Sequence, residues 1–550
     1  MKKPLLSELT LREKIGQLGN YRNWDIANKI RSNHKDLPLI GSIWAMGALD
    51  MKVINMADES TGKKIPAKAQ WEFLHEFNKN TKIPTILAMD CTRGIQNAFY
   101  DLSKQMDSPT IGATGSEELS YRLGVCKANE LKCAGAQWLW GPEEDLANRN
   151  SAVSLGRKFS DNPDDVIRLA KAQNKGIQSV KVAATAKHFP GDDELEYRDP
   201  HVSAAMLRLS VKDWEARQGR IFQEIIDDGV YSVMVGHQSF PAYDNTKHNN
   251  QYLPATVSYK VVTELLKEKM GFKGVVITDA IGMHSLLDMF NDDPIQISIA
   301  CIKAGCDVIL GASGEFIDGI EQAVLNGEIP ESRIDDACQR VLDMKEKLGV
   351  FDGPLEEQDQ EKAVLESAKL NQDVAEHALS LVCDNNKMIP LNPEKYKNVT
   401  IVYSGYGKGI LESLDYMKDE FIKHGAENVN IVENLCSKAL ATELSNQSDL
   451  MLYVSHINCH QPSGVAGYQE DAFVTFYHTT IGKQKGKRIG VSLCSPYVYF
   501  DYYYDFDCFV NAFNNTEETQ RAFVKALYGE IKFEGVQPFK LVPDGFEVNY

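Results

Sequence analysis

The stretch Val182-Ala183-Ala184-Thr185-Ala186-Lys187-His188-Phe189-Pro190-Gly191 decides the fold, because a run of small apolar residues ends abruptly in two basic side chains. Short apolar runs are typical of buried strands, and the proline and glycine end this one. In α/β barrels the carboxyl ends of strands hold the substrate, and the loops that follow deliver acids and bases. A Lys-His pair at such an end predicts a functional position.

Outward from this stretch, residues 1–350 alternate between short apolar strands and amphipathic helices, which predicts a (β/α)8 TIM-like barrel. Seven strand candidates lie at residues 39–44, 84–90, 136–140, 182–188, 231–236, 274–279 and 307–310. Several of them end in polar or ionisable side chains, namely Asp90, Lys187, His188, His237 and Asp279. Seven candidates leave one barrel strand unidentified.

A second region of alternating strands and helices follows a charged stretch. Residues 351–370 are interpreted as a linker, whose charged start at 351–362 leads into a helix at 363–379. Strands are then expected at residues 399–403, 429–432, 450–454, 488–493 and 508–511. Residues 371–550 are therefore expected to form a smaller, doubly wound α/β sandwich domain.

Composition narrows the class of partner. The formal charge of -18 argues against a nucleic acid or an anionic membrane, since both need a basic surface. No run of apolar residues has the length that spans a bilayer, and the basic start Lys2-Lys3 lacks the apolar stretch of a signal peptide. The 11 cysteines follow no paired spacing. Reduced thiols and a cytoplasmic location are the expectation.

Two acidic or basic positions carry the predicted chemistry. Asp279 ends the strand Gly274-Val275-Val276-Ile277-Thr278, although a helix N-cap would explain the same carboxylate. In Asp199-Pro200-His201 a carboxylate can orient an imidazole, although a polar loop with an incidental histidine is the plainer alternative. Glycoside hydrolysis needs a carboxylate beside the anomeric carbon and a separate proton donor.

Together these segments resemble glycoside hydrolase family 3, and within it the β-N-acetylglucosaminidase branch. That family shows Lys-His-Phe-Pro-Gly followed by a loop closing in Asp-Ser-His, and a strand ending in a nucleophile within Gly-Val-Ile-x-Thr-Asp-x-x-x-Met. The corresponding residues here are 187–191, 199–201 and 274–283. Further matches lie at residues 11–17, 156–163, 253–258 and 522–533. The resemblance covers nearly the whole chain.

The resemblance implies a role for each matching residue. Asp279 is similar to the nucleophile, His201 to the acid/base and Asp199 to its partner. The sugar-binding matches are Asp90, Arg157, Lys187 and His188, with His237 and Met283 lining the pocket. The implied activity is a retaining, exo-acting β-N-acetylglucosaminidase that cleaves terminal GlcNAc from a small carbohydrate. No cofactor and no metal are expected.

Three departures from the family pattern leave alternatives within the fold. Pro200 replaces the serine of the dyad, and the acidic residues 192–198 form a longer loop, interpreted as solvated. Residues 90–94 read Asp-Cys-Thr-Arg-Gly where the family often has Asp-Gln-Glu-Gly-Gly. An imidazole acid/base does not repel phosphate, so a β-N-acetylglucosaminide phosphorylase that uses inorganic phosphate is one alternative. A β-glucosidase or β-xylosidase is the other.

Two features of the second region suggest other classes of protein. The glycines of residues 405–409, with Glu433 beyond them, mimic a dinucleotide site, but Ile410 and Glu412 leave the third glycine misplaced. Residues 456–460 read His-Ile-Asn-Cys-His without a partner cluster of metal-site spacing. A plain turn and a loop are the preferred interpretations. A non-catalytic sugar-binding protein is disfavoured because Asp279 and His201 are both present. The oligomeric state and the role of the second domain stay open.

Overall fold

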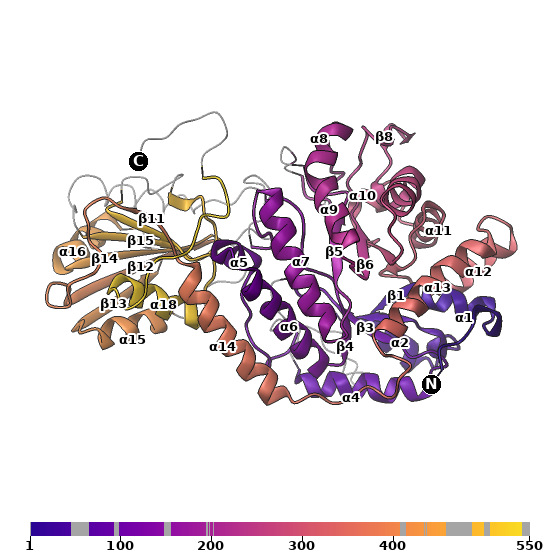
Figure 1. Ribbon diagram of the computed structural model, residues 1–550, viewed down its shortest axis with the longest axis horizontal. Coiled ribbons are helices and arrows are strands. Elements are labelled where there is room, and N and C mark those ends of the chain that lie inside the picture. The colour runs from indigo at the N-terminus through magenta and orange to yellow at the C-terminus, as the bar shows by residue number, and fades with distance from the viewer. Residues whose placement is uncertain are drawn as a thin grey trace. The chain divides into compact units, whose positions relative to one another are not determined.

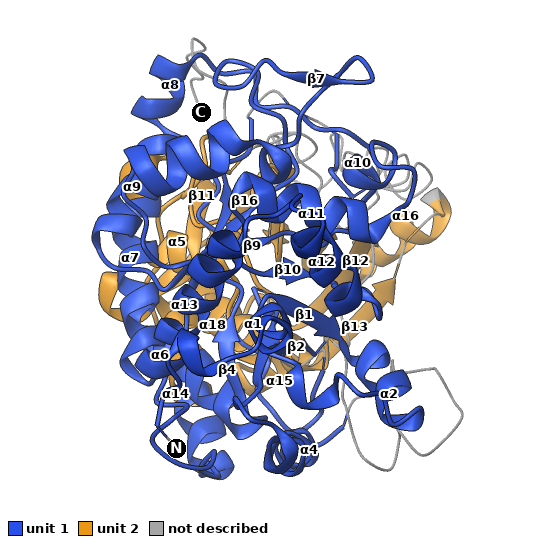
Figure 2. Ribbon diagram, turned by 90° about the vertical axis from the view of Figure 1, so that its right-hand side faces the viewer, with its two compact units in different colours: residues 1–105, 120–146, 166–367 blue, residues 106–119, 147–165, 368–550 orange. Residues whose placement is uncertain are grey.

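The computed structural model describes residues 2–45, 65–92, 98–147, 156–193, 196, 198–201, 203–406, 414–433, 435, 437–457, 487–499 and 506–541. The chain divides into two units (Figure 2). Unit 1 comprises residues 1–105, 120–146 and 166–367, and unit 2 comprises residues 106–119, 147–165 and 368–550. Each unit is described by itself.

Unit 1 contains two parallel sheets (Figure 1). The first has the order β10 (Ile309–Leu310), β1 (Gly19–Arg22), β2 (Ser42–Trp44), β3 (Ile86–Met89), β4 (Ala136–Leu139). The second has the order β5 (Thr185–Phe189), β6 (Ser232–Val235), β9 (Val275–Thr278). Single parallel bridges join Trp138 to Ala183 and Ile277 to Val308. An antiparallel hairpin pairs β7 (Lys247–His248) with β8 (Gln251–Tyr252).

Amphipathic helices alternate with these strands and lie outside them (Figure 2). They are α1 (Leu11–Gln17), α2 (Asn23–Arg31), α4 (Ala67–Phe77), α6 (Glu117–Cys133), α7 (Pro163–Ser179), α8 (Val211–Ala216), α9 (Gln218–Asp227), η5 (Lys260–Lys269), α10 (His284–Leu287), α11 (Pro294–Ala304), α12 (Phe316–Leu325) and α13 (Glu331–Lys347). Single helical turns are η1 (Leu6–Glu8), η2 (Leu37–Leu39), η3 (Asn78–Asn80) and η4 (Ala255–Val257).

Local sequence explains where these elements begin. Helix α1 starts with a capping box in which Thr10 and Glu13 satisfy each other's backbone N–H groups. Helix α11 starts at Pro294, whose missing N–H is harmless there, and Asp293 caps the first turn. Strand β9 consists of four fully buried residues, as expected of a strand with neighbours on both sides. All seven expected strand segments contain a strand.

Strand β1 was not expected from the sequence. Its residues Gly19, Asn20, Tyr21 and Arg22 are too polar and too short to form an apolar run. They are a strand because β10 and β2 pair with them on both sides, and Asn20 donates from Nδ2 to Ser42 Oγ at 2.9 Å. Tertiary pairing has overridden local propensity here.

Unit 2 is built on a six-stranded sheet with the order β11 (Ser380–Asp384), β16 (Cys508–Asn511), β15 (Arg488–Ser492), β14 (Leu450–Ile457), β12 (Asn398–Tyr406), β13 (Asn428–Glu433). Only the β11–β16 pair is antiparallel. The helices of the region are α5 (Ser108–Thr114), α14 (Gln360–Ala378), α15 (Asp415–Lys423), α16 (Lys438–Gln447) and α18 (Glu517–Leu527).

Five of these strands coincide with the expected ones, and the sixth, β11, was missed. Its residues follow a helix directly, with no loop signal in the sequence between Ala378 and Ser380. Helix α14 begins at Gln360, three residues before the expected start. No helix in the described part of the chain combines the length and the apolar character that a membrane span needs.

Candidate active site

Asp279 stands at the carboxyl end of β9, where two neighbouring strands fix the backbone. Its N–H donates to Val235 O at 2.9 Å on the β6 side. On the β10 side, the N–H of Leu310 donates to Thr278 Oγ1 at 3.0 Å. The Asp279 carboxylate accepts a hydrogen bond from the Ala280 N–H at 2.7 Å. The side chain is 14% exposed, so it borders solvent without being freely hydrated.

The charges of three histidines act on the Asp279 carboxylate. Burial raises the pKa of the carboxyl, whereas the charges of His188, His237 and His201 lower it, and the net pKa lies below the ordinary value. The nearest is His188, whose Nε2 lies 3.9 Å from Asp279 Oδ2. Asp279 is therefore an ionised carboxylate at neutral pH, the form that a nucleophile requires.

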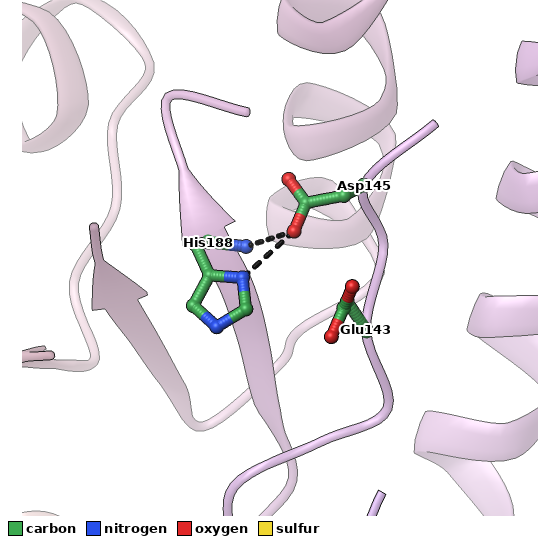
Figure 3. A group of neighbouring side chains, drawn as sticks. All are labelled: Glu143, Asp145 and His188. Carbon is green, nitrogen blue, oxygen red and sulfur yellow. Dashed lines mark hydrogen bonds and ion pairs between the residues drawn. The ribbon is translucent and has the colours of Figure 1, made fainter. Parts of the chain in front are cut away.

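Asp145 holds the imidazole of His188 in place (Figure 3). Its Oδ2 accepts from both the backbone N–H of His188 at 3.0 Å and the ring Nδ1 at 2.7 Å. Its Oδ1 accepts from the Asp192 N–H at 3.1 Å. Burial lowers the pKa of His188, but the hydrogen bond and charge of Asp145 outweigh it and the net pKa is raised. The ring is thus fixed with Nε2 towards Asp279.

Asp145 belongs to an acidic run after β4 that was not predicted as part of the site. Glu144 Oε2 accepts from the Lys187 N–H at 2.7 Å, and the Glu144 N–H donates to Lys187 O at 2.9 Å. Burial raises the pKa of Glu144 well above its usual range. Three successive acids directly after an apolar strand, at residues 143–145, were the signal that could have found them.

Glu143, Asp145 and His188 also place one ligand atom each within 4.8 Å of one another, close enough for a shared ion (Figure 3). These three residues do not offer a complete set of metal ligands, because His188 Nδ1 is already hydrogen-bonded to Asp145. The ring nitrogen that remains faces Asp279. Glu420, His424 and Glu530 of unit 2 form a second such group. There Glu420 is already paired with Lys423 and Arg521.

Lys187 and Asp90 form a charge-assisted pair at the ends of β5 and β3. Lys187 Nζ donates to Asp90 Oδ1 at 3.0 Å. The lysine side chain is fully buried, whereas that of Asp90 is 41% exposed. The Asp90 carboxylate therefore faces solvent, and the buried Lys187 ammonium group holds it in place. Such an arrangement suits recognition of sugar hydroxyls.

His201 and Asp199 form the predicted dyad on the loop that follows β5. Asp199 Oδ1 accepts from the His201 N–H at 2.9 Å and from the ring Nδ1 at 2.6 Å. Asp199 is buried, and His201 is 35% exposed. The His201 carbonyl accepts from the His284 N–H at 3.3 Å, which ties this loop to the segment that follows Asp279. The hydrogen bond from Nδ1 to Asp199 orients the imidazole ring.

His237 and Met283 lie against the backbone next to Asp279. His237 Nε2 donates to Ala280 O at 3.0 Å, and its Nδ1 pairs with Thr256 Oγ1 at 2.9 Å. Burial lowers the pKa of His237. Both ring nitrogens are thus engaged by the protein, and His237 fixes the backbone that carries Asp279. Met283 is buried just before α10.

The remaining predicted features lie elsewhere. Arg157 belongs to unit 2, whereas the other predicted site residues belong to unit 1. The expectation of a solvated acidic loop is wrong for Asp193 and Glu196, which are buried. Glu196 is buried because it forms ion pairs with Arg198 and Arg208. The sequence analysis named a glycine-rich turn that begins at residue 405 and a His-Ile-Asn-Cys-His stretch that begins at residue 456. In these two segments, residues 407–410 and 458–460 lie outside the described part of the chain.

The sequence of this chain matches a family model described as "Glycosyl hydrolase family 3 N terminal domain" over residues 10–344. A "Beta-N-acetylglucosaminidase/beta-glucosidase" of Cellulomonas fimi is 24% identical over 480 residues, which is 83% of each chain. A "Beta-hexosaminidase" of Stenotrophomonas maltophilia (strain K279a) is 30% identical over 251 residues, covering 44% of this chain and 71% of that protein.

Solved structures show the same fold. "Beta-glucoside phosphorylase BglX" has a TM-score of 0.82 at 23% identity and covers 98% of this chain and 94% of its own. A family 3 β-N-acetylglucosaminidase from Paenibacillus sp. str. FPU-7 has a TM-score of 0.78 at 23% identity, with 97% of this chain and 99% of its own covered.

Proposed function

Since this chain belongs to glycosyl hydrolase family 3 and is a glycoside hydrolase acting on O-glycosyl bonds, we propose that it is a retaining, exo-acting β-N-acetylglucosaminidase that removes terminal GlcNAc. The observation that carries the proposal is the ionised Asp279 on which the charges of three histidines act. One of them, His201, is paired with Asp199, and its backbone bonds the segment that follows Asp279. A carboxylate and a separate proton donor are what retaining hydrolysis needs.

In the first step, Asp279 attacks the anomeric carbon of the sugar. The bond from that carbon to the glycosidic oxygen breaks as His201 Nε2 transfers its proton to the leaving oxygen. Asp199 stabilises the imidazolium beforehand and keeps the ring oriented through Nδ1. The product is a glycosyl-enzyme joined through the Asp279 carboxylate, with the aglycone released.

In the second step, the neutral His201 accepts a proton from water. The water oxygen forms a bond to the anomeric carbon while the bond to the Asp279 carboxylate breaks. Two inversions restore the β configuration of the released sugar. Asp90 binds sugar hydroxyls, with the buried Lys187 contributing through its hydrogen bond to that carboxylate, and His188 supports the charge of the nucleophile. The family resemblance proposes Arg157 as a further sugar ligand.

The preference for a 2-acetamido sugar rests on the names of the relatives, one of which is also called a β-glucosidase. A β-glucosidase or β-xylosidase is therefore the second candidate. Phosphorolysis is a third, because an imidazole acid/base leaves the acceptor position without a carboxylate that would repel phosphate. In that reaction a phosphate oxygen replaces water in the second step.

We also propose the domain architecture and the cellular location of the protein. We take residues 1–350 as a TIM-like barrel, 351–370 as a linker and 371–550 as an α/β sandwich. The two single bridges, Trp138 with Ala183 and Ile277 with Val308, support closure because each joins the edges of the two parallel sheets. A cytoplasmic location is supported by nine described cysteines that are buried and not joined in disulfides.

One panel of p-nitrophenyl glycosides tests the activity. The purified protein is assayed on β-N-acetylglucosaminide, β-glucoside and β-xyloside, each with and without phosphate, and the products are separated. We expect the highest kcat/KM on the acetamido sugar. Asp279→Asn should lower its turnover by about 10⁴-fold, because the nucleophile is lost while the volume is kept. Turnover of none of the three glycosides by well-folded protein would refute the proposal.

A further inference from the structure

Arg22, which ends the unexpected strand β1, lies where four strands of unit 1 end. An added Cβ at Gly282, three residues after Asp279, would lie 3.0 Å from Arg22 Nη2. One at Gly311, directly after β10, would lie 3.4 Å from both Nε and Nη2. Trp44, at the end of β2, is the third neighbour. The guanidinium therefore borders the segment that carries the nucleophile.

The rings of two tryptophans contact the Arg22 guanidinium but do not neutralise its charge. Its Cζ lies 5.2 Å from the ring centroid of Trp24 and 5.8 Å from that of Trp44. Cation–π contacts cover the faces of a guanidinium and leave the N–H groups at its edge available. Within the described part of the chain no carboxylate forms an ion pair with Arg22, and its buried Nε has no hydrogen-bond partner. Its charge does act on the half-buried Asp25, whose pKa is raised by burial and lowered by Arg22.

A second hydrogen-bond donor without an acceptor belongs to the ring that contacts Trp44. Trp140, at the end of β4, is fully buried, and its Nε1–H has no acceptor among the described residues. The rings of Trp44 and Trp140 are in edge contact, with centroids 5.4 Å apart. Buried polar groups are normally hydrogen-bonded, so two unpaired donors in one neighbourhood favour a site that binds a hydrogen-bond acceptor.

The chemistry of the occupant follows from these groups, which are all donors and carry a net positive charge. A hydroxyl would bring a proton of its own that finds no acceptor here, whereas an oxyanion brings acceptors only. Guanidinium groups bind carboxylate and phosphate in a bidentate manner through their edge. We propose that Arg22, with Trp24, Trp44 and Trp140, binds an oxyanion beside the nucleophile segment.

Two sources fit this oxyanion, and both rest on the proposed glycosidase function. One is inorganic phosphate as acceptor, whose oxygen bonds to the anomeric carbon as the bond to the Asp279 carboxylate breaks, releasing a sugar phosphate. The other is a carboxylate carried by the substrate. The assignment of Arg22 is the same in either case.

The test compares Arg22→Met, Arg22→Lys and Trp24→Ala with wild-type protein and with Arg31→Met, an arginine at the carboxyl end of helix α2, which begins directly after Arg22. The first measurement is calorimetric titration with inorganic phosphate alone, which needs no turnover. The second is kcat/KM on p-nitrophenyl and 3-carboxy-4-nitrophenyl β-N-acetylglucosaminide, with and without phosphate. Trp24 is 37% exposed, so its alanine variant tests the site even where the arginine variants fold poorly.

We expect Arg22→Met to weaken phosphate binding, or to lower the preference for the carboxylated over the neutral substrate, by at least about tenfold. Arg22→Lys and Trp24→Ala should show smaller losses, and Arg31→Met none. A loss in the phosphate arm alone identifies the acceptor, and a loss in the carboxylate arm alone identifies the substrate. Equal values for Arg22→Met and wild-type protein in both arms overturn the assignment. A wild-type protein that binds phosphate but hydrolyses no glycoside refutes the proposed function and not this site.

Discussion

At the scale of single residues, the site depends on how charges are arranged around one carboxylate. Asp279 keeps a lowered pKa despite its burial because of the charges of three histidines, and the pKa of His188 is raised because Asp145 bonds its ring. The sequence predicted Asp279, His201 and Asp199 from motifs. Asp145 was missed although the acidic run at residues 143–145 was a signal, because its pairing with His188 comes from a loop crossing to β5. Arg22 could not be predicted, because it lies in a strand without an apolar pattern.

Asp145→Asn should change the pH dependence of activity. Without the carboxylate, burial prevails and the pKa of His188 falls, so Asp279 loses a nearby positive charge and its pKa rises. The acidic limb of the kcat/KM profile should then move to higher pH. Asp352→Asn, at an exposed position, is the control. An unmoved acidic limb with reduced kcat would show that Asp145 only supports the fold.

His201→Ala should be most damaging for substrates with poor leaving groups. A proton donor matters little when the leaving phenolate is already stable, and much when it is an alkoxide. We expect a loss of about 10²–10⁴-fold on a sugar aglycone and a far smaller loss on dinitrophenyl glycosides. His284→Ala is the matched control, because only its backbone touches His201. Equal losses on all leaving groups would contradict the acid/base role.

At the scale of elements, helix α13 contributes an unusual anchor at the amino ends of the strands. Lys345 Nζ donates to Gln17 Oε1 at 2.7 Å, Gly41 O at 2.9 Å and Pro84 O at 2.7 Å, just before β1, β2 and β3. The lysine is fully buried, and burial lowers its pKa to about 7. Apolar runs predicted strands β2 and β3, but a buried lysine that joins them to β1 has no local sequence signal.

Lys345 should make stability rise with pH above neutrality. Its folded pKa of about 7 lies below the unfolded value near 10.5, so folding releases a proton between these values. Wild-type protein should gain about 2 kcal/mol in unfolding free energy between pH 7 and pH 9 relative to Lys345→Met, which cannot titrate. Chemical denaturation at both pH values measures this. Parallel pH dependence of the two proteins would contradict the assignment.

At the scale of the whole molecule, the two units are interleaved along the chain. Residues 106–119 and 147–165 belong to unit 2 although they lie within the sequence of the predicted barrel domain. The core of unit 2 includes Ala113 and Ala147 together with Tyr497, Phe513 and Phe539. Strand patterns in the sequence indicated two regions, but contacts between distant segments carry no periodicity and were not predictable from one sequence.

A chain that stops after residue 370 should therefore fold poorly. Ala113 and Ala147 would lose the aromatic side chains that bury them, and apolar surface would be exposed. We expect insoluble material, or a melting temperature lowered by roughly 5 °C or more relative to the full chain, by size-exclusion chromatography and thermal unfolding. A stable, monodisperse fragment would instead show that the region folds on its own.

Interleaving also has a consequence during synthesis. About 200 residues separate position 165 from position 368, so at roughly 5–20 residues per second the early segments of unit 2 leave the ribosome some 10–40 s before the rest of unit 2 begins to emerge. Throughout that interval Ala113 and Ala147 are without their final neighbours. Nascent chains stalled near residue 367 should accordingly recruit holdase chaperones, and the need should vanish once Phe539 has emerged from the exit tunnel.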